Sequence, residues 1–266
     1  GSLRRKMASN SLSRGITWSL VRQTILSYPV APRVATRLAL PITASMTSTT
    51  TTPLAVLVSG GLDSAILVGE ELARRPFVLP IYVRFGLRWE EVELMYLRRF
   101  LADLPASNLR PLVVLDMPIR DVYGHHWSTT GASVPDADSP DEAVFLPGRN
   151  ALLLVKSLLW CHLHAIPEIA LAPLESNPFP DATPRFFESF SGAVNQGVGG
   201  AVRVVLPYAG LHKEQVLQRG IHLPLQHTFS CIQPRNGLHC GRCNKCAERQ
   251  KGFRAAGVVD PTFYAE

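Results

Sequence analysis

Long apolar stretches are absent from this 266-residue chain. No run of about 18 or more consecutive apolar residues occurs, so the sequence predicts neither a transmembrane helix nor a membrane partner. Cysteine is scarce, with five residues, and we recognise no secretory signal, which argues against a secreted domain built on disulfides. Because 46% of the residues are hydrophobic, the chain can bury the core of one large domain, and we expect a globular cytoplasmic protein.

Acidic residues are absent from residues 1–52, which carry seven Lys and Arg side chains and end in a Ser/Thr run. Three interpretations stay open: a disordered tail, an organelle transit peptide, and sequence upstream of the natural start. Gly1-Ser2 resembles a cloning scar, and Met46 stands where a natural start would be expected, so we predict a non-structural extension. All 21 Asp and Glu but only 20 of the 27 Lys and Arg follow residue 52. Residues 53–266 therefore carry a net charge of −1. We therefore expect no basic surface for nucleic acid.

A small-residue loop joins an apolar strand to a helix in residues 54–64, LAVLVSGGLDS. No Gly-Lys-Ser/Thr follows the glycines and no G-x-G-x-x-G occurs, which excludes the Walker and dinucleotide-binding forms. Gly60 and Gly61 let the backbone approach phosphate oxygens. The hydroxyls of Ser59 and Ser64 can donate to those oxygens, and a helix beginning near Asp63 adds free N–H groups and a favourable dipole. We predict a nucleotide-binding loop rather than an ordinary glycine-rich turn. The residues predicted to bind the nucleotide are Val58, Ser59, Gly60, Gly61, Leu62, Asp63, Ser64, Ala65, Ile66, Leu67 and Val68.

Four of the five cysteines lie in one short stretch with the spacing C-x8-C-x2-C-x2-C. Thiolates three positions apart can face one ion because the chain turns between them, and four soft ligands favour tetrahedral zinc. Since four cysteines leave no open coordination position, we predict a structural Zn²⁺ site, with a [4Fe–4S] cluster as the open alternative. The predicted ligands are Cys231, Cys240, Cys243 and Cys246. The fifth cysteine, Cys161, lies in an apolar run and is predicted to be a core residue.

Buried strands alternate with amphipathic helices after residue 53, which predicts an α/β fold with a doubly wound parallel sheet and a ligand at the carboxyl ends of its strands. Strands are expected at 54–58, 77–83, 111–115, 168–172 and 202–206. Helices are expected at 63–74, 90–101, 150–164, 183–195, 213–218 and 246–256. Residues 116–147 are rich in Asp, Ser, Gly, Pro and His and are predicted to form a long functional loop. We divide the chain into the extension (1–52), a nucleotide-binding domain (53–225) and a small zinc-binding knuckle with a final helix (226–266).

Several further motifs occur in order along the chain. They are Leu146-Pro147-Gly148-Arg149-Asn150 before a helix, Asn177-x-x-x-Asp181 before a Phe-rich helix, the turn Leu211-His212-Lys213, and Lys251-Gly252-Phe253 after the cysteines. The hexapeptide Ser-Gly-Gly-Leu-Asp-Ser resembles the loop of the PP-loop ATP pyrophosphatases, which split ATP between the α and β phosphates. From about residue 55 to residue 261, the whole set resembles the 7-cyano-7-deazaguanine synthase family.

The resemblance implies an ATP-dependent ligase of queuosine-type biosynthesis. In that family 7-carboxy-7-deazaguanine is activated as an adenylate, and ammonia then forms the amide. The amide is activated again and dehydrated to the nitrile 7-cyano-7-deazaguanine (preQ0). The resemblance therefore implies ATP, Mg²⁺ and Zn²⁺ as cofactors. It also implies a deazapurine carboxylate, ATP and ammonia as small-molecule partners, and it leaves a homodimer open.

The motifs assign roles to individual residues. Asp63 and Ser64 are expected to hold the pyrophosphate, and Asp63 either reaches Mg²⁺ or caps its helix. Arg149 stands at a helix start, where a cation is unfavourable, so we expect it to stabilise phosphate charge. Lys213 resembles the phosphate-facing lysine of the family, with a solvated lysine as the alternative. The residues predicted as catalytic are Asp63, Ser64, Arg149 and Lys213. The residues predicted for the substrate from these motifs are Asn150, Asn177 and Asp181, with turn and capping roles as the alternative.

One segment departs from the family pattern. The family carries Asp-Tyr-Gly-Gln-x-His after its second strand, whereas residues 84–90 read Arg-Phe-Gly-Leu-Arg-Trp-Glu. We predict that Arg88 and Trp89 read the substrate in place of the missing Gln and His, by a guanidinium fork and by stacking. The alternative is that Trp89 is a core residue. In the long loop, His125, His126 and Trp127 could cover a base or simply be exposed.

Three other functions stay open beside the leading one. The altered segment 84–90 allows a diverged enzyme that passes an adenylated deazapurine acid to another amine. A tRNA-thiolating PP-loop enzyme is a further alternative, against which the nearly neutral body argues. A zinc-ribbon binding module with an inactive loop is the third, and the intact hexapeptide argues against it.

Overall fold

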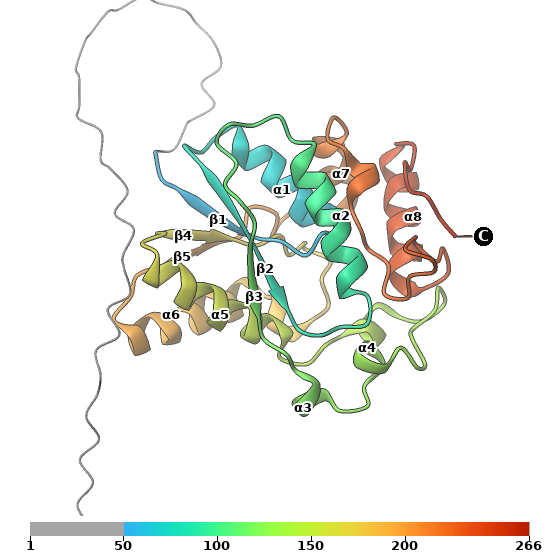
Figure 1. Cartoon of the computed structure of the whole chain (residues 1–266), viewed down its shortest axis with the longest axis horizontal. Coiled ribbons are helices and arrows are strands. Elements are labelled where there is room, and N and C mark those ends of the chain that lie inside the picture. Colours follow the sequence, from blue (N-terminus) through green and yellow to red (C-terminus); the bar gives the residue numbers. More distant parts are fainter. Residues whose placement is uncertain (1–50, 266) are drawn as a thin grey trace, which may run out of the picture. The chain divides into compact units, whose positions relative to one another are not determined.

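The computed structural model describes residues 51–265, which fall in one compact unit (Figure 1). The predictions for residues 1–50, including the extension, Gly1-Ser2 and Met46, lie outside the described residues. No helix between residues 51 and 265 is long and apolar enough to cross a bilayer.

Five strands form one sheet in which every neighbouring pair is parallel. The strands are β1 (Leu54–Leu57), β2 (Val78–Arg84), β3 (Val113–Asp116), β4 (Glu168–Ala170) and β5 (Arg203–Val205). Their order is β3-β2-β1-β4-β5, so the chain builds outward on one side of β1 and then crosses to the other side. All four residues of β1 are buried, as expected for the apolar centre of a parallel sheet. The strand order reverses between β1 and β4, and such a point opens a crevice at the carboxyl ends of the strands.

Helices cover both faces of the sheet (Figure 1). They are α1 (Leu62–Leu72), α2 (Glu90–Ala102), α5 (Arg149–Leu163), α6 (Pro184–Val198), α7 (Lys213–Gly220) and α8 (Asn244–Ala256). Leu54 and Val56 of β1 pack in a core with α1, α2, α7 and α8. Ala55 and Leu57 pack on the opposite face with α5 and α6, because successive side chains of a strand point to opposite sides. This arrangement confirms the predicted doubly wound α/β fold.

The predicted strands and helices all form, with small shifts at their ends. The last helix, α8, begins at Asn244 rather than at 246, because Cys243 already serves as its N-cap in an extended conformation. Helix α6 continues past 195 to Val198 and ends at Gly199, whose φ of 62° suits glycine. Helix α7 continues past 218 to Gly220.

Residues 116–147, predicted to be a loop, contain short helical segments. These are α3 (Arg120–Tyr123), α4 (Trp127–Thr130) and the 3-10 turn η1 (Asp141–Val144); two further turns, η2 (Pro180–Ala182) and η3 (Leu225–His227), lie elsewhere. Local capping explains α4, because the His126 ring accepts from the Ser128 N–H and Gly131 ends the helix with φ 78°. These short helical segments were not predicted, since single helical turns need no apolar periodicity, and a functional role for the loop stays a prediction.

Helices α1 and α7 lie in direct contact because a glycine removes the side chain between them. A Cβ at Gly220 would overlap the side chain of Ile66, which is fully buried in α1. The close approach lets Val216 and Leu217 of α7 fill the same core as α1. It also sets Lys213, the first residue of α7, beside the loop that follows β1.

We expect Gly220→Ala to destabilise the protein by about 1–3 kcal/mol, because overpacking forces α7 away from α1. The matched control is Gly192→Ala in α6, where a Cβ would meet nothing within 4 Å. There the same substitution should stabilise by about 0.5–1 kcal/mol through helix propensity. Urea unfolding of both variants measures the difference, and equal midpoints would show that the α1–α7 contact does not depend on glycine.

Candidate active site

A cavity of about 300 Å³ opens at the carboxyl ends of β1, β2 and β4, where the strand order reverses. Its walls come from the loop after β1, the starts of α2, α5 and α7, and the segments near residues 171–182, 229–232 and 245–249. The residues predicted from the sequence that line it are Val58, Ser59, Gly61, Leu62, Asp63, Ser64, Trp89, Arg149, Asn150, Asn177, Asp181 and Lys213. The fold thus collects most of the predicted site in one place.

The loop after β1 is compact and glycine-dependent. The Ser59 N–H donates to Ser64 Oγ at 3.2 Å, and the two hydroxyl oxygens lie 3.4 Å apart. Gly60 has a φ of 75°, and a Cβ there would lie 3.0 Å from Glu93 Cγ, so the position requires glycine. Within the described chain no side chain caps α1 at its N-cap, Gly61. The loop therefore offers hydroxyls and free helix N–H groups to an anion, as phosphate binding requires.

Among the residues predicted for nucleotide, substrate or catalysis, six do not line the cavity: Gly60, Ala65, Ile66, Leu67, Val68 and Arg88. The four residues from 65 to 68 are at most 1% exposed and fill the core beneath the loop, so their role is to hold it in place. Arg88 is exposed, and its side chain lies against Gly131, away from the cavity. The structure therefore separates Arg88 from its neighbour Trp89, because adjacent side chains at a helix start point in different directions.

Lys213 forms ion pairs with two carboxylates. Its Nζ lies 2.6 Å from Asp63 Oδ2 and 3.1 Å from Glu248 Oε1. Burial alone would lower the pKa of Lys213, but the two carboxylates outweigh it and raise that pKa. Burial opposes ionisation of Glu248, yet the ammonium groups of Lys213 and Lys245 bring its pKa down to about 2. At neutral pH Lys213 and Glu248 are therefore both charged, and Lys213 lines the cavity beside Asp63.

Arg149 brings a positive charge to the cavity from the start of α5. Gly148 precedes it with a φ of 75° and acts as the N-cap, so the arginine lies in the first turn, where the helix dipole disfavours a cation. Its guanidinium carbon lies 6.0 Å from the centre of the Phe85 ring. Its Nε is buried and has no hydrogen-bond partner among residues 51–265. A buried donor of this kind is costly without an acceptor, so the site suits an anionic ligand.

Asp181 and Asn150 bind each other at the rim of the cavity. Asp181 Oδ2 accepts from the Asn150 N–H at 3.1 Å, and Asn150 Nδ2 donates to Asp181 Oδ1 at 3.2 Å. The pair ties η2 to the first turn of α5 and so helps to hold Arg149. Asn177 Oδ1 accepts from the Phe179 N–H at 3.0 Å, which fixes a turn on the same wall.

Two tryptophans form an aromatic wall. The rings of Trp89 and Trp127 lie 5.7 Å apart with an interplanar angle of 15°, and both side chains line the cavity. Trp89 is only 4% exposed and also belongs to the core, so the two interpretations of this residue are compatible. Of the loop histidines, His126 caps α4, and burial lowers its pKa; His125 is exposed.

The cavity also contains residues that sequence reasoning missed. The polar ones are Tyr82, Glu93, Ser230, Lys245, Glu248 and Arg249, and the other aromatic ones are Phe145, Phe179, Phe187 and Phe229. One signal could have found Glu93: it falls on the apolar face of α2, between Trp89 and Leu97 at helical spacing. A carboxylate in a buried stripe is unusual and marks a candidate functional group. No such local signal exists for Phe229, which lies in an irregular segment.

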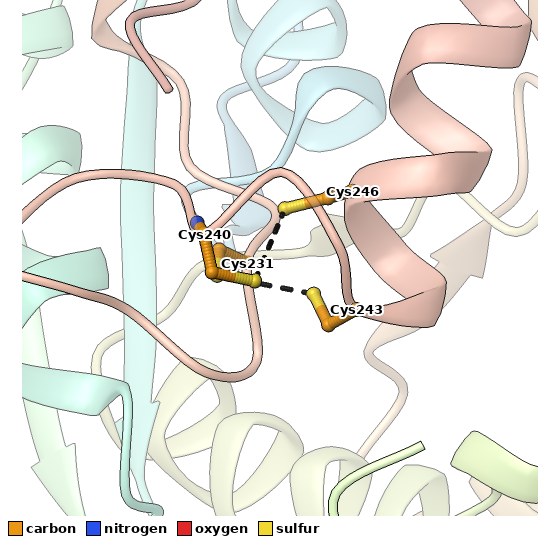
Figure 2. A group of neighbouring side chains, drawn as sticks. All are labelled: Cys231, Cys240, Cys243 and Cys246. Carbon is orange, nitrogen blue, oxygen red and sulfur yellow. Dashed lines mark hydrogen bonds between the residues drawn. The ribbon is translucent and has the colours of Figure 1, made fainter. Parts of the chain in front are cut away.

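The four clustered cysteines meet beside the start of α8 (Figure 2). Their Sγ atoms all lie within 4.8 Å of one another, with 3.8 Å between Cys231 and Cys243 and 4.0 Å between Cys240 and Cys246. Four thiolates around zinc, each about 2.3 Å from the ion, would lie about 3.8 Å apart. Backbone N–H groups of Gln233 and Cys240 donate to Cys231 Sγ, each at 3.3 Å. The donor set and its spacing therefore fit a tetrahedral metal ion.

The cysteine cluster is joined to the loop after β1 through a buried arginine. Arg249 of α8 is 1% exposed and donates from Nη1 to Thr228 Oγ1 at 2.9 Å and to Ser230 Oγ at 3.3 Å. Between these two residues, the Phe229 N–H donates to the Gly60 carbonyl oxygen at 2.7 Å. The knuckle and the loop thus form one continuous unit. The fifth cysteine, Cys161, lies apart in α5, where burial raises its pKa to about 12.

Comparison with known proteins gives a consistent result. Residues 54–257 match the family model described as "Queuosine biosynthesis protein QueC". A 7-cyano-7-deazaguanine synthase of Myxococcus xanthus is 33% identical over 227 residues, covering 79% of this chain and 96% of that protein. Proteins of the same name from Solidesulfovibrio magneticus and Thiobacillus denitrificans are 33% and 32% identical, each across 79% of this chain and 94% and 97% of theirs. The chain belongs to the QueC family.

Proposed function

We propose that this chain is an ATP-dependent ligase that converts 7-carboxy-7-deazaguanine and ammonia to 7-cyano-7-deazaguanine through an adenylated intermediate. The observation that carries the proposal is the single cavity shared by the glycine loop, Arg149 and Lys213. Membership of the QueC family and the common name of its curated relatives support the same reaction for this chain.

The nucleotide is held by the loop and the two cations. Ser59, Ser64 and the free N–H groups at the start of α1 bind the pyrophosphate part of ATP. Arg149 and Lys213 both line the cavity and stabilise the negative charge that develops when the bond between the α and β phosphates breaks. For Arg149, a phosphate oxygen supplies the acceptor that its buried Nε lacks within the described chain.

Asp63 is suited to be a ligand of Mg²⁺. Its Oδ2 pairs with Lys213, whereas Oδ1 is buried without a hydrogen-bond partner among the described residues. A carboxylate oxygen beside such a loop is the kind of ligand Mg²⁺ prefers, so Asp63 would hold the ion, which would supply positive charge to the phosphates. The same carboxylate would then orient both Lys213 and the ion.

The acid binds on the aromatic side of the cavity. Trp89 and Trp127 offer flat apolar faces to a deazapurine ring, and Asn177 also lines the cavity. Asp181 and Asn150 act by holding Arg149 in place, because their polar atoms already bind each other.

The products of the reaction test the proposal directly. Incubation with 7-carboxy-7-deazaguanine, ATP, Mg²⁺ and ammonium should give the nitrile, AMP and pyrophosphate, as followed by mass spectrometry and phosphorus NMR. ADP as the nucleotide product would contradict the adenylation step. An unconverted acid would contradict the substrate assignment.

Replacing Asp63 by Asn should slow AMP formation by about 100-fold or more, because the variant loses a carboxylate that orients both Mg²⁺ and Lys213. Its melting temperature should stay near that of the wild type, since Glu248 still pairs with Lys213. Asp121→Asn is the control, because Asp121 is exposed in α3 outside the cavity. Similar rates in the two variants would mean that Asp63 has no part in the reaction.

Removal of a cysteine ligand should unfold the knuckle rather than slow the chemistry. We expect about one zinc per wild-type chain, and we expect Cys243→Ala to lose the metal and to unfold at lower temperature, because metal binding is coupled to folding. Cys161→Ala serves as the control and should keep its zinc, since this residue lies in α5 away from the cluster. Elemental analysis and thermal melts give the answer; iron in place of zinc, or a Cys243→Ala protein with full metal content, would refute the assignment.

A further inference from the structure

Glu93 is the buried acid of the cavity that the roles above leave unused. Its residue is 7% exposed, and its side chain lines the cavity from the inner face of α2. Trp89 and Leu97, four positions before and after Glu93 on this face, are apolar, and the buried Glu90 lies three positions before it. A carboxylate in such a stripe costs folding free energy, so its presence needs an explanation other than stability.

The position of Glu93 places it directly behind the phosphate loop. A Cβ at Gly60 would lie 3.0 Å from Glu93 Cγ and 3.2 Å from its backbone oxygen, so the loop backbone rests on this residue. The Tyr82 hydroxyl, at the carboxyl end of β2, donates to Glu93 Oε2 at 2.5 Å, and the Trp89 side chain also donates to the carboxylate. The carboxyl group is therefore oriented by two donors next to the loop.

Burial brings the pKa of Glu93 close to neutral pH, so both forms of the carboxyl group are populated there. Burial raises the pKa of Glu93 to about 7, against the opposing effects of the Arg149 guanidinium and the Tyr82 hydroxyl. Glu90, on the same helix, adds a further upward shift. In return, burial and the Glu93 carboxylate raise the pKa of Tyr82, so the phenol stays a hydrogen-bond donor. An acid with a pKa near the working pH can both accept and release a proton.

We propose that Glu93 is the general base of the amine step, held in place by Tyr82, for a reaction whose identity rests on the function proposed above. The ammonia nitrogen forms a bond to the carbonyl carbon of the acyl adenylate, and the carbon–oxygen bond to AMP breaks with its electron pair. One N–H proton passes to the Glu93 carboxylate, which leaves a neutral amide and free AMP. After the amide oxygen is adenylated, two N–H protons leave in total, and Glu93 accepts them one at a time and returns each to solvent. Breakage of the second bond to AMP then yields the nitrile.

The test separates adenylation from the amine step. Glu93→Gln keeps the size of the side chain and an acceptor for Tyr82 but cannot take a proton. We expect its acid-dependent exchange of pyrophosphate into ATP, which needs no amine, to stay within about 3-fold of wild type. Nitrile formation, measured at a constant concentration of un-ionised ammonia, should fall by about 100- to 10,000-fold. Glu91→Gln is the control, because the Glu91 side chain is 76% exposed and should leave both rates unchanged.

The pH profile supplies a readout that a purely structural role would not move. Because the base works only when ionised, wild-type nitrile formation should fall below about pH 7, and Glu93→Gln should lose this limb. Tyr82→Phe removes a hydrogen bond that lowers the pKa of Glu93, so the acid limb of this variant should move to higher pH.

A Glu93→Gln enzyme with the wild-type rate and pH profile would overturn the proposal. A Glu93→Gln enzyme whose exchange rate and melting temperature fall together with nitrile formation would also overturn it. A wild-type protein without acid-dependent exchange would overturn the proposed function itself and, with it, the role of Glu93.

Discussion

The hydrogen bond from the Phe229 N–H to the Gly60 carbonyl, at 2.7 Å, ties the phosphate loop to the rest of the site. Phe229 lies two residues before Cys231, the first cysteine of the cluster. It also lies between Thr228 and Ser230, whose hydroxyls accept hydrogen bonds from Arg249. A loop of glycine and serine has little side-chain packing of its own, so its conformation must be imposed from outside. The knuckle supplies that constraint, so a metal ion bound by the four cysteines would also stabilise the loop.

Buried charge is the second organising feature of the cavity. Asp63, Lys213 and Glu248 pair within 3.1 Å and are only 18–30% exposed, and removing such charges from water costs folding free energy. Arg149 adds a guanidinium whose Nε has no partner in residues 51–265. We interpret this arrangement as preorganisation. Charged groups that are already fixed in position need not rearrange when negative charge develops on a phosphate.

The two faces of the cavity serve different chemistry. The glycine loop, Arg149 and Lys213 form a polar side, whereas Trp89 and Trp127 form an aromatic side. Glu93 and Tyr82 lie where these sides meet, behind Gly60. An acyl adenylate joins a phosphate to an aromatic acid, so its reacting carbon belongs at such a boundary. In the proposed reaction the amine attacks that carbon, and a base at the same place shortens the path of its proton.

The order of strands and helices, the phosphate loop and the four clustered cysteines were readable from sequence, because periodicity, glycine placement and ligand spacing are local properties. Sequence alone placed Arg88 and Trp89 together, and only the fold turned one to solvent and the other into the cavity. The pairing of Lys213 with Asp63, 150 positions apart, depends on the packing of α7 against α1. The environment of Glu93 likewise needed β2, α5 and the loop to converge. A residue's charge state and neighbours are set by segments distant in the chain, and those meet only when the tertiary structure forms.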